Sequence, residues 1–301
     1  MSSRVSTFVS RLACSVVVFC CVSPSILSQA QVQQATCRFS PSNINAPGAV
    51  YFSVSGVNSW DTVVGSAFFA HAPTQGFARY ADGSLQYFLI PNSLFTYFTA
   101  RNNRGVSVGY YALVGTVTMK GFMLNGSTLT SISFPKRGPR GTFATGINKW
   151  NTVVGYYIDS SKLSHGFKRF SNGSFITLDY PGASETFPAA INNSGVIVGS
   201  YYDGNGTHGF IYQNGQWTTV DRVVGLGNTS LSGISDSGVA VGNWNWRVNV
   251  PFLYQNGVYG DLEDPAADFG STVATGMAST GLIVGYETIN SMENKFTATC
   301  Q

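Results

Sequence analysis

The chain has 301 residues, of which 10% are charged, 14% are aromatic and 34 are glycine. This composition is typical of a turn-rich, all-β protein, and the sequence shows no long helical period. Without residues 1–30 the chain keeps 15 basic and 14 acidic residues, so it has no basic stripe that could neutralise a run of phosphates. Nucleic acid is therefore excluded as an expected partner.

Residues 1–30 have the features of a signal peptide. Arg4 and Arg11 form a basic start, and the uncharged apolar run of residues 12–22 follows them. That run is too short to span a membrane. Residues 28–30, Ser-Gln-Ala, place small residues where a signal peptidase cleaves. We expect export, extracellular or periplasmic, with cleavage near Ala30 and no membrane attachment afterwards.

A unit of about 44 residues recurs along the chain and is clearest in residues 146–184. One marker is the glycine after an apolar run that ends in valine, and the other is a phenylalanine that usually follows a glycine. The glycines recur every 43 to 46 residues and the phenylalanines every 42 to 45. The markers are Gly65, Gly109, Gly155, Gly199, Gly242 and Gly285, with Phe77, Phe122, Phe167, Phe210, Phe252 and Phe296. Because two independent markers stay in step, the sequence predicts a repeat architecture.

Each unit predicts four short β-strands. In the clearest copy, residues 142–147 and 153–157 are rich in β-branched and aromatic residues, and a turn at residues 148–151 separates them. Residues 166–170 and 175–180 meet across Asn172-Gly173, and an Asn-Gly pair between strands is a strong hairpin signal. Pro181 then closes the fourth strand.

Four antiparallel strands in about 44 residues match a β-propeller blade, whereas the β-repeats of solenoids, the competing interpretation, are usually shorter. Five complete units start near Ser53, Ala100, Thr145, Ala190 and Ser232, and a sixth starts at Thr275 and stops after its third strand. Residues 35–41 resemble residues 175–181, proline included, so we expect the N-terminal strand to complete the last blade. The sequence predicts a single domain, residues 31–301, folded as a six-bladed β-propeller of four-stranded antiparallel blades.

Two cysteines remain beyond the signal peptide, Cys37 and Cys300, on the two strands that this closure makes neighbours. In an oxidising compartment a disulfide between them would link the two ends of the domain. Aligning Pro41 with Pro181 places the two cysteines about three residues out of direct opposition, which is unfavourable for disulfide geometry. Two free or intermolecular thiols are the alternative.

The unit also resembles a known family. The pattern I-N-x-x-G-x-x-V-G-x-Y, followed by H-G-F, an Asn-Gly turn and D-Y-P-G, is similar to the bacterial extracellular repeat called HAF, after its His-Ala-Phe tripeptide. The resemblance covers nearly all of residues 31–301. Glycine replaces the alanine of the tripeptide, and four units lack its histidine, with Gln75, Lys120, Val250 and Asn294 instead. The resemblance implies an exported bacterial protein and no established activity.

No motif for metal or cofactor binding is present in the sequence. His165 and His208 hold the same position in successive units, which lie apart in a propeller, so we expect each to bond within its own blade. The carboxylates Asp159 and Asp203 fall between second and third strands, while Glu185, Asp264 and Asp268 fall between units. The usual propeller layout places both loop sets on one face, where they would form either a glycoside-cleaving pair or solvated charges. We expect no cofactor, no metal site and no assigned catalytic residue.

The candidate ligand-binding residues are cations, one carboxylate and aromatic side chains. One inter-unit loop contains Lys136, Arg137 and Arg140. These cations would either bind an anionic group such as an acidic sugar or remain solvated. Glu185 belongs to the next inter-unit loop, and Trp244 and Trp246 flank a loop between the second and third strands. These tryptophans, with Trp60 and Trp150 of the first turns, would stack on sugars or, more commonly, fill the wedge between blades.

Together these features predict a secreted, monomeric, non-catalytic binding module for an unidentified extracellular polysaccharide or protein. The alternative is a secreted carbohydrate-active hydrolase or lyase with loop carboxylates at one mouth of the propeller. A purely structural surface protein is a third interpretation. An enzyme needs at least two titratable side chains from different blades within reach of one pocket, which separates the first two hypotheses.

Overall fold

The computed structural model describes residues 36–41, 44–223, 228–245 and 247–300. These residues form 24 β-strands and no helix, which confirms the all-β prediction. Within the same residues no helix exists with the length and apolar character to cross a membrane. The signal peptide predicted for residues 1–30 lies outside the described residues.

The strands follow the repeat, and the units are numbered 1 to 6 in chain order. Unit 1 holds β2 (Tyr51–Val57), β3 (Val63–Phe69), β4 (Ala72–Arg79) and β5 (Leu85–Phe88). Unit 2 holds β6 (Ser93–Arg101), β7 (Val106–Leu113), β8 (Lys120–Asn125) and β9 (Thr128–Ile132). Unit 3 holds β10 (Gly141–Ile147), β11 (Val153–Ile158), β12 (Ser164–Arg169) and β13 (Phe175–Leu178).

The second half of the chain repeats this order. Unit 4 holds β14 (Glu185–Ile191), β15 (Ile197–Tyr202), β16 (Thr207–Gln213) and β17 (Gln216–Val220). Unit 5 holds β18 (Thr229–Ile234), β19 (Ala240–Asn245), β20 (Asn249–Gln255) and β21 (Val258–Asp261). Unit 6 holds β22 (Val273–Met277), β23 (Ile283–Ile289) and β24 (Met292–Cys300), and β1 (Cys37–Pro41) precedes all of these in the chain.

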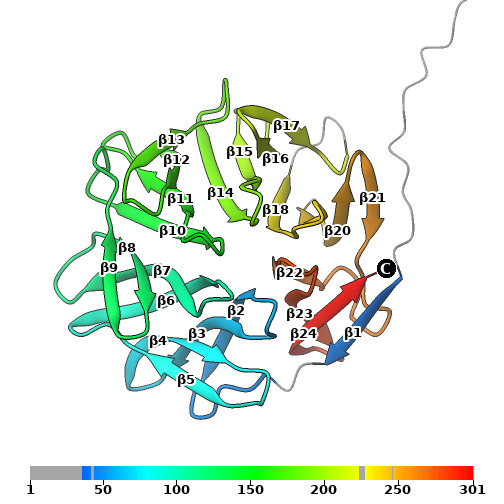
Figure 1. Cartoon of the computed structure of the whole chain (residues 1–301). Helices are drawn as coiled ribbons and strands as arrows, with labels where there is room; N and C mark the ends of the chain where they lie inside the picture. Colours follow the sequence, from blue (N-terminus) through cyan, green and yellow to red (C-terminus); the bar gives the residue numbers. More distant parts are fainter. Residues whose placement is uncertain (1–35, 42–43, 224–227, 246, 301) are drawn as a thin grey trace, which may run out of the picture. The chain divides into compact units, whose positions relative to one another are not determined.

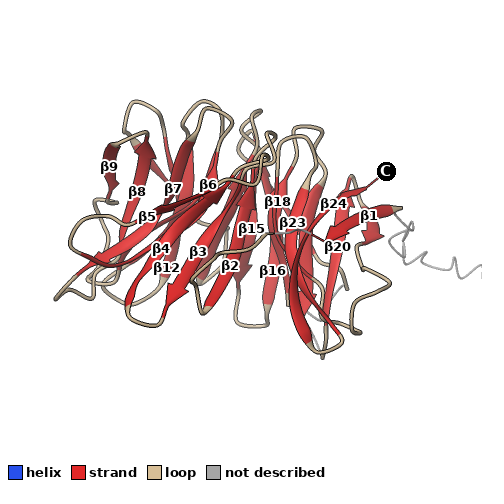
Figure 2. Ribbon diagram, turned by 90° about the horizontal axis from the view of Figure 1, so that it is seen from below, coloured by secondary structure: helices blue, strands red, loops and turns tan. Residues whose placement is uncertain are grey.

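Within each unit the strands pair antiparallel in chain order. Units 3, 4 and 5 are separate four-stranded sheets, and a fourth sheet has the order β1-β24-β23-β22, so the N-terminal strand completes unit 6. Units 1 and 2 form one eight-stranded sheet because a single parallel bridge, Thr74 to Phe95, joins β4 to β6. The strands run between two sets of turns, as the side view shows (Figure 2).

The two sequence markers are cross-strand partners. In unit 3, Gly155 on β11 lies opposite Phe167 on β12, and the same pairing occurs in the other units. A β-bulge in each first strand brings that strand's backbone over the glycine, so a Cβ added at Gly155 would lie 2.0 Å from the carbonyl oxygen of Phe143. The phenylalanine is fully buried in every unit. Steric exclusion at the glycine and burial of the phenylalanine therefore explain why both residues recur.

Asparagine side chains in the first turns link neighbouring units. The Asn148 side-chain oxygen accepts hydrogen bonds from the backbone N–H groups of Trp150 and Thr152 within its own turn. Its Nδ2 donates to the carbonyl oxygen of Asn192 in the next unit, at 3.2 Å. The equivalent donors Asn58, Asn102 and Asn192 reach the carbonyl oxygens of Asn102, Asn148 and Ser235. Each asparagine therefore accepts hydrogen bonds from backbone N–H groups of its own turn and donates one to the turn of the next unit.

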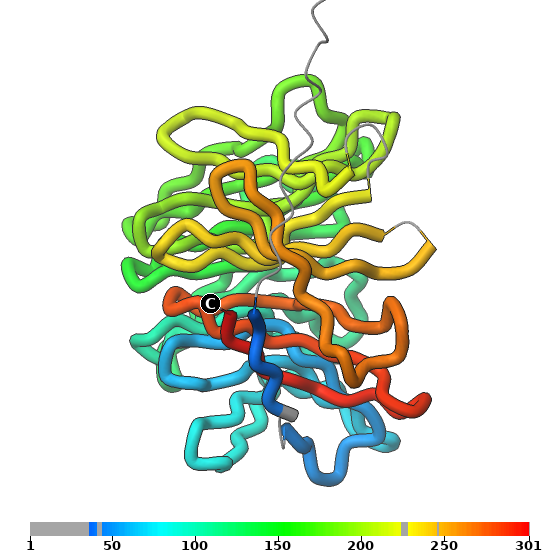
Figure 3. Tube along the Cα trace, turned by 90° about the vertical axis from the view of Figure 1, so that its right-hand side faces the viewer, coloured from blue at the N-terminus to red at the C-terminus, as the bar shows by residue number. Residues whose placement is uncertain are grey.

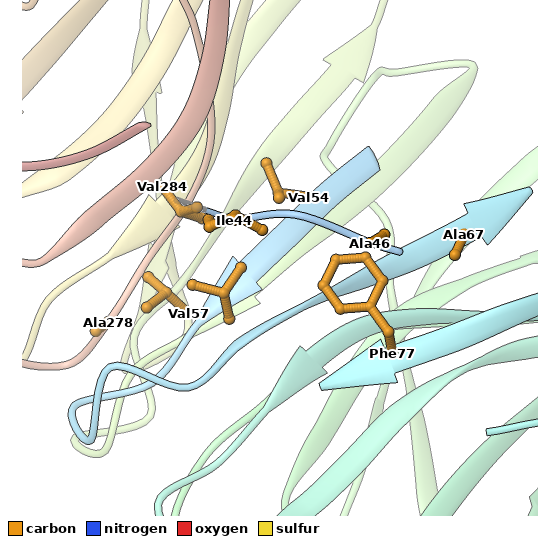
Figure 4. Close-up of a cluster of buried hydrophobic side chains, with 9 residues drawn as sticks. Ile44, Ala46, Val54, Val57, Ala67, Phe77, Ala278 and Val284 are labelled. Carbon is orange, nitrogen blue, oxygen red and sulfur yellow. The ribbon is translucent and has the colours of Figure 1, made fainter. Parts of the chain in front are cut away.

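The first strands of successive units are also in contact. The contacting pairs are β2 and β6, β6 and β10, β10 and β14, β14 and β18, and β18 and β22, and β22 in turn contacts β2 (Figure 1). A buried cluster joins unit 1 to unit 6, because Val57 and Phe77 share it with Ala278 and Val284 (Figure 4). Apolar burial of this kind stabilises the contact between the first and last units.

The N-terminal strand β1 runs beside β24 (Figure 3), and Cys37 forms a disulfide with Cys300. The offset of three residues expected from the sequence is wrong, since Cys37 lies directly opposite Cys300. Pro41 lies opposite Phe296, the position that Thr177 holds opposite Phe167, and so it is the last paired residue of the strand rather than a residue after it. An edge strand tolerates proline because its outer N–H groups need no partner.

Candidate functional site

A cavity of about 510 Å³ lies among the first strands of all the units. Residues of β2, β6, β10, β14, β18 and β22 line it together with residues of the turns that follow these strands. Amide and hydroxyl groups are frequent in the lining, among them Asn103, Asn193, Ser200 and Ser230. Small-molecule sites are usually concave and combine apolar walls with a few polar groups, so this cavity is the candidate functional site.

One wall of the cavity is aromatic. Tyr156 of β11 and Phe187 of β14 line it, and their ring centroids are 5.3 Å apart in an edge-to-face arrangement. The aromatic contacts continue behind them through Phe143, 4.7 Å from Tyr156, to Tyr110. Burial, with a smaller contribution from Tyr110, raises the pKa of Tyr156 to about 12, so its hydroxyl stays protonated and can donate a hydrogen bond. The wall thus offers ring faces and a donor.

The first-turn tryptophans lie on the surface. Trp60 is 69% exposed and Trp150 is 55% exposed, so the expectation that they fill wedges between blades is wrong. Both residues lie in the turns that follow the first strands of their units. The Trp150 Nε1–H donates a hydrogen bond to the carbonyl oxygen of Asn193, at 3.2 Å, which fixes the ring beside a residue of the cavity lining.

His165 and His208 bond within their own units, as predicted. In unit 3, His165 Nδ1 lies 3.0 Å from Asp179 Oδ2, and its Nε2 lies 3.4 Å from Asp159 Oδ2. In unit 4, His208 lies between Asp221 and Asp203 at 3.0 and 3.5 Å. Each imidazole stacks on a tyrosine, Tyr157 or Tyr201.

Asp159 and Asp203 were expected as glycoside-cleaving or solvated loop carboxylates, and neither they nor Asp179 and Asp221 were predicted to contact the histidines. Asp179 and Asp221 occupy the same position after the fourth strand, in the two units that keep the histidine at this place, and that joint occurrence was a usable signal. The pKa of Asp159 lies below its usual range, chiefly because it accepts the backbone N–H of Leu163, with His165 as a further cause. The pKa of Asp203 is lowered by the backbone N–H of Asn205 and then by His208.

Within the described residues no group of three or more histidine, cysteine or carboxylate side chains could hold a metal ion.

The structure does not bring the other sequence-predicted ligand residues together. Lys136 and Arg140 are exposed between β9 and β10, while the Arg137 Nε–H donates to Ser133 Oγ at 2.6 Å. Glu185 accepts the backbone N–H of Ser164, and half-buried Trp244 packs against a core cluster of units 4 and 5. None of these residues lines the cavity. Trp246 lies outside the described residues.

Of the remaining loop carboxylates, Asp268 accepts backbone N–H groups of Asn290 and Ser291 and so joins an inter-unit loop to the loop between β23 and β24. Asp264 instead lies beside Glu287, which is 2% exposed. Glu287 lies opposite Asn294, the register position that Tyr157 holds opposite His165 in unit 3. A buried carboxyl therefore replaces an aromatic ring in unit 6. Burial, followed by the charge of Asp264, raises the pKa of Glu287 to about 7.

This shift predicts a loss of stability with rising pH. The folded-state pKa of Glu287, about 7, lies above the ordinary value of 4.5. Between these two pH values the folded protein therefore keeps a proton on Glu287 that the unfolded chain releases. The free energy of unfolding should therefore fall as pH rises from about 4.5 to about 7, by up to about 3 kcal/mol at about 1.4 kcal/mol per pKa unit. Urea unfolding between about pH 5 and about pH 8 measures this change.

The variant Glu287→Gln should flatten that dependence and be the more stable protein at about pH 8, because no buried carboxylate then forms. Glu263→Gln, at an exposed site on the adjacent loop, is the matched control and should keep the wild-type slope. An equal slope in wild type and Glu287→Gln would show that Glu287 does not titrate in this window.

Comparisons with known proteins bear on the fold. No model of a known protein family matches the chain, and no curated protein matches it. Among solved structures it is similar to AofleA from Arthrobotrys oligospora, with a TM-score of 0.52 and 10% identity over 89% of this chain and 92% of that one. It is also similar to the Aleuria aurantia lectin in complex with α-methyl-L-fucoside, with a TM-score of 0.52 and 11% identity over 83% and 94% of the two chains.

A third similar structure is the Trypanosoma rangeli sialidase, with a TM-score of 0.51 and 11% identity over 82% of this chain and 54% of that one. At such identities the likeness concerns the fold alone. It supports a β-propeller fold for the all-β, four-stranded antiparallel sheets described above.

Proposed function

We propose that residues 31–301 form a closed, six-bladed β-propeller that is exported and binds carbohydrate in the cavity among its first strands, without catalysing a reaction. Closure is supported by the contact of β22 with β2, by the cluster shared by Phe77 and Val284, and by the strand pair β1 and β24. A closed ring leaves no free sheet edge between the first and last blades.

The cavity itself carries the proposal for carbohydrate. Sugar rings present C–H faces that pack on aromatic side chains and hydroxyls that exchange hydrogen bonds with amides and hydroxyls. Tyr156 and Phe187 supply the aromatic faces, while Ser200, Ser230 and Asn193 supply the polar groups. A similar structure, the Aleuria aurantia lectin, is in complex with a fucoside, which is consistent with a propeller that binds sugar.

Export is supported by the features of residues 1–30 and by the disulfide between Cys37 and Cys300, because disulfides persist in oxidising compartments. The HAF resemblance points the same way, to a bacterial extracellular protein. The carbohydrate-active hydrolase or lyase is the second candidate. The Glu287 and Asp264 pair has the chemistry of a protonated acid beside a carboxylate, but Glu287 is 2% exposed and neither residue lines the cavity.

The test is a glycan-array screen of purified residues 31–301, with turnover measured on the same saccharides. The proposal predicts binding to a subset of glycans without change to them. Cleavage of a bound glycan would show that the protein is an enzyme rather than a non-catalytic binding module. Binding to no glycan on a broad array would contradict the proposal that the protein binds carbohydrate.

A further inference from the structure

The first turns of units 1, 2 and 3 carry unusual side chains at one equivalent position. Trp60, Arg104 and Trp150 each stand two residues after the asparagine that begins the turn. The corresponding residues of units 4, 5 and 6 are Ser194, Ser237 and Thr280. Turn geometry needs only the asparagine, so it does not require indole or guanidinium groups at this position. We call Trp60, Arg104, Lys149 and Trp150 the turn surface.

Two cations lie close to the Trp150 ring on this surface. The Arg104 guanidinium carbon lies 5.9 Å from the Trp150 ring centroid, and Lys149 Nζ lies 4.8 Å from it. Arg104, Lys149 and Trp150 are all exposed. In the described part of the chain no carboxylate forms an ion pair with Arg104 or Lys149. Two positive charges therefore share one exposed indole without a negative partner, and an anion would relieve their repulsion.

Two other charges lie on these turns. Asp61 follows Trp60 in the unit 1 turn, and Asp236 in unit 5 accepts hydrogen bonds from the backbone N–H and Nδ2 of Asn193. The positive charges are thus concentrated on units 2 and 3. Lys149 also lines the cavity, so the turn surface is continuous with the candidate site.

We propose that the turn surface binds an acidic saccharide, with a sugar ring on Trp150 and a carboxylate between Arg104 and Lys149. This inference rests on the proposed carbohydrate binding and names its ligand class. Guanidinium and ammonium groups both form charge-assisted hydrogen bonds with carboxylates, and an indole face packs on a sugar ring. An uncharged saccharide would pack on the indole but would leave both cations without a counter-charge.

The experiment compares an oligogalacturonate with its methyl ester, which keeps the sugar chain and removes the charge. Isothermal titration of residues 31–301 should show the acid form binding about tenfold or more tightly than the ester, with a preference that weakens as salt rises. Arg104→Met should lower affinity for the acid form about fivefold while leaving the ester unchanged, because Arg104 is not among the residues that line the cavity. Lys149→Met should lower affinity for the acid form by more than it lowers affinity for the ester. Lys136→Met, at an exposed cation outside the turn surface, is the matched control and should bind both ligands as wild type does.

Equal affinity for acid and ester would overturn the acidic-saccharide inference and leave the proposed carbohydrate binding intact. Failure of both ligands to bind, in a protein that binds other glycans on the array, would overturn the inference in the same way. Polyglutamate is a further probe. If it binds as tightly as the oligogalacturonate and loses affinity equally in Trp150→Ala, the surface recognises anions in general and the saccharide assignment is wrong.

Discussion

Replacing both Cys37 and Cys300 by serine is expected to lower the free energy of unfolding by about 5 kcal/mol. The disulfide joins residues 263 positions apart, and in the chain-entropy model a loop of that length restricts the unfolded chain by about this amount. The double variant avoids a free thiol that could form intermolecular bonds. Guanidinium unfolding followed by tryptophan fluorescence measures the difference.

Reduction of the wild-type protein is the control for this experiment, because it breaks the same bond without changing the sequence. It should give the same loss as the double variant. A loss below about 1 kcal/mol in both would mean that β1 stays paired with β24 in the unfolded ensemble or adds little to the fold.

The variant Phe167→Ala is expected to cost about 3 to 5 kcal/mol of stability, because it empties a fully buried site between two strands and their neighbours. The ring contacts Phe134 and Phe175, so its removal also takes away two aromatic contacts. Since every unit holds this phenylalanine, Phe122→Ala and Phe252→Ala should cost similar amounts. Thermal and urea unfolding measure all three variants.

Phe170→Ala provides the matched control in the same unit, since Phe170 is only half-buried and packs against the Lys168 side chain. It should cost about 1 kcal/mol or less. A similar cost for Phe167→Ala and Phe170→Ala would contradict the interpretation that the repeated phenylalanine is the main core residue of each unit.

The strands were predictable because their causes are local. Asn-Gly turns and β-branched runs define hairpins within about 20 residues, and repetition of the unit checks each assignment against the others. The position of the N-terminal strand was also predictable from the missing fourth strand. Its register was not, because Pro41 looked like a residue that ends a strand, whereas an edge strand accepts it.

The candidate site was less predictable because its residues come from every unit. Tyr156, Ser200 and Ser230 line one cavity through tertiary contacts that no local pattern reports. The exposure of Trp60 and Trp150 depends on how the turns pack against neighbouring units, which composition does not reveal. By contrast, the joint occurrence of His165 with Asp179 and of His208 with Asp221 was present in the repeat and identifies those pairs.

Binding of carbohydrate in the cavity can be tested with a pair of equivalent phenylalanines. Phe187 of β14 lines the cavity, whereas Phe143 holds the same position in β10 and is not among the lining residues. Both are half-buried, so truncating either should perturb the fold to a similar extent. Calorimetric titration with the tightest-binding glycan should show Phe187→Ala losing about tenfold or more in affinity and Phe143→Ala staying within about twofold of wild type. Equal affinities in the two variants would contradict the assignment of the cavity as the carbohydrate site.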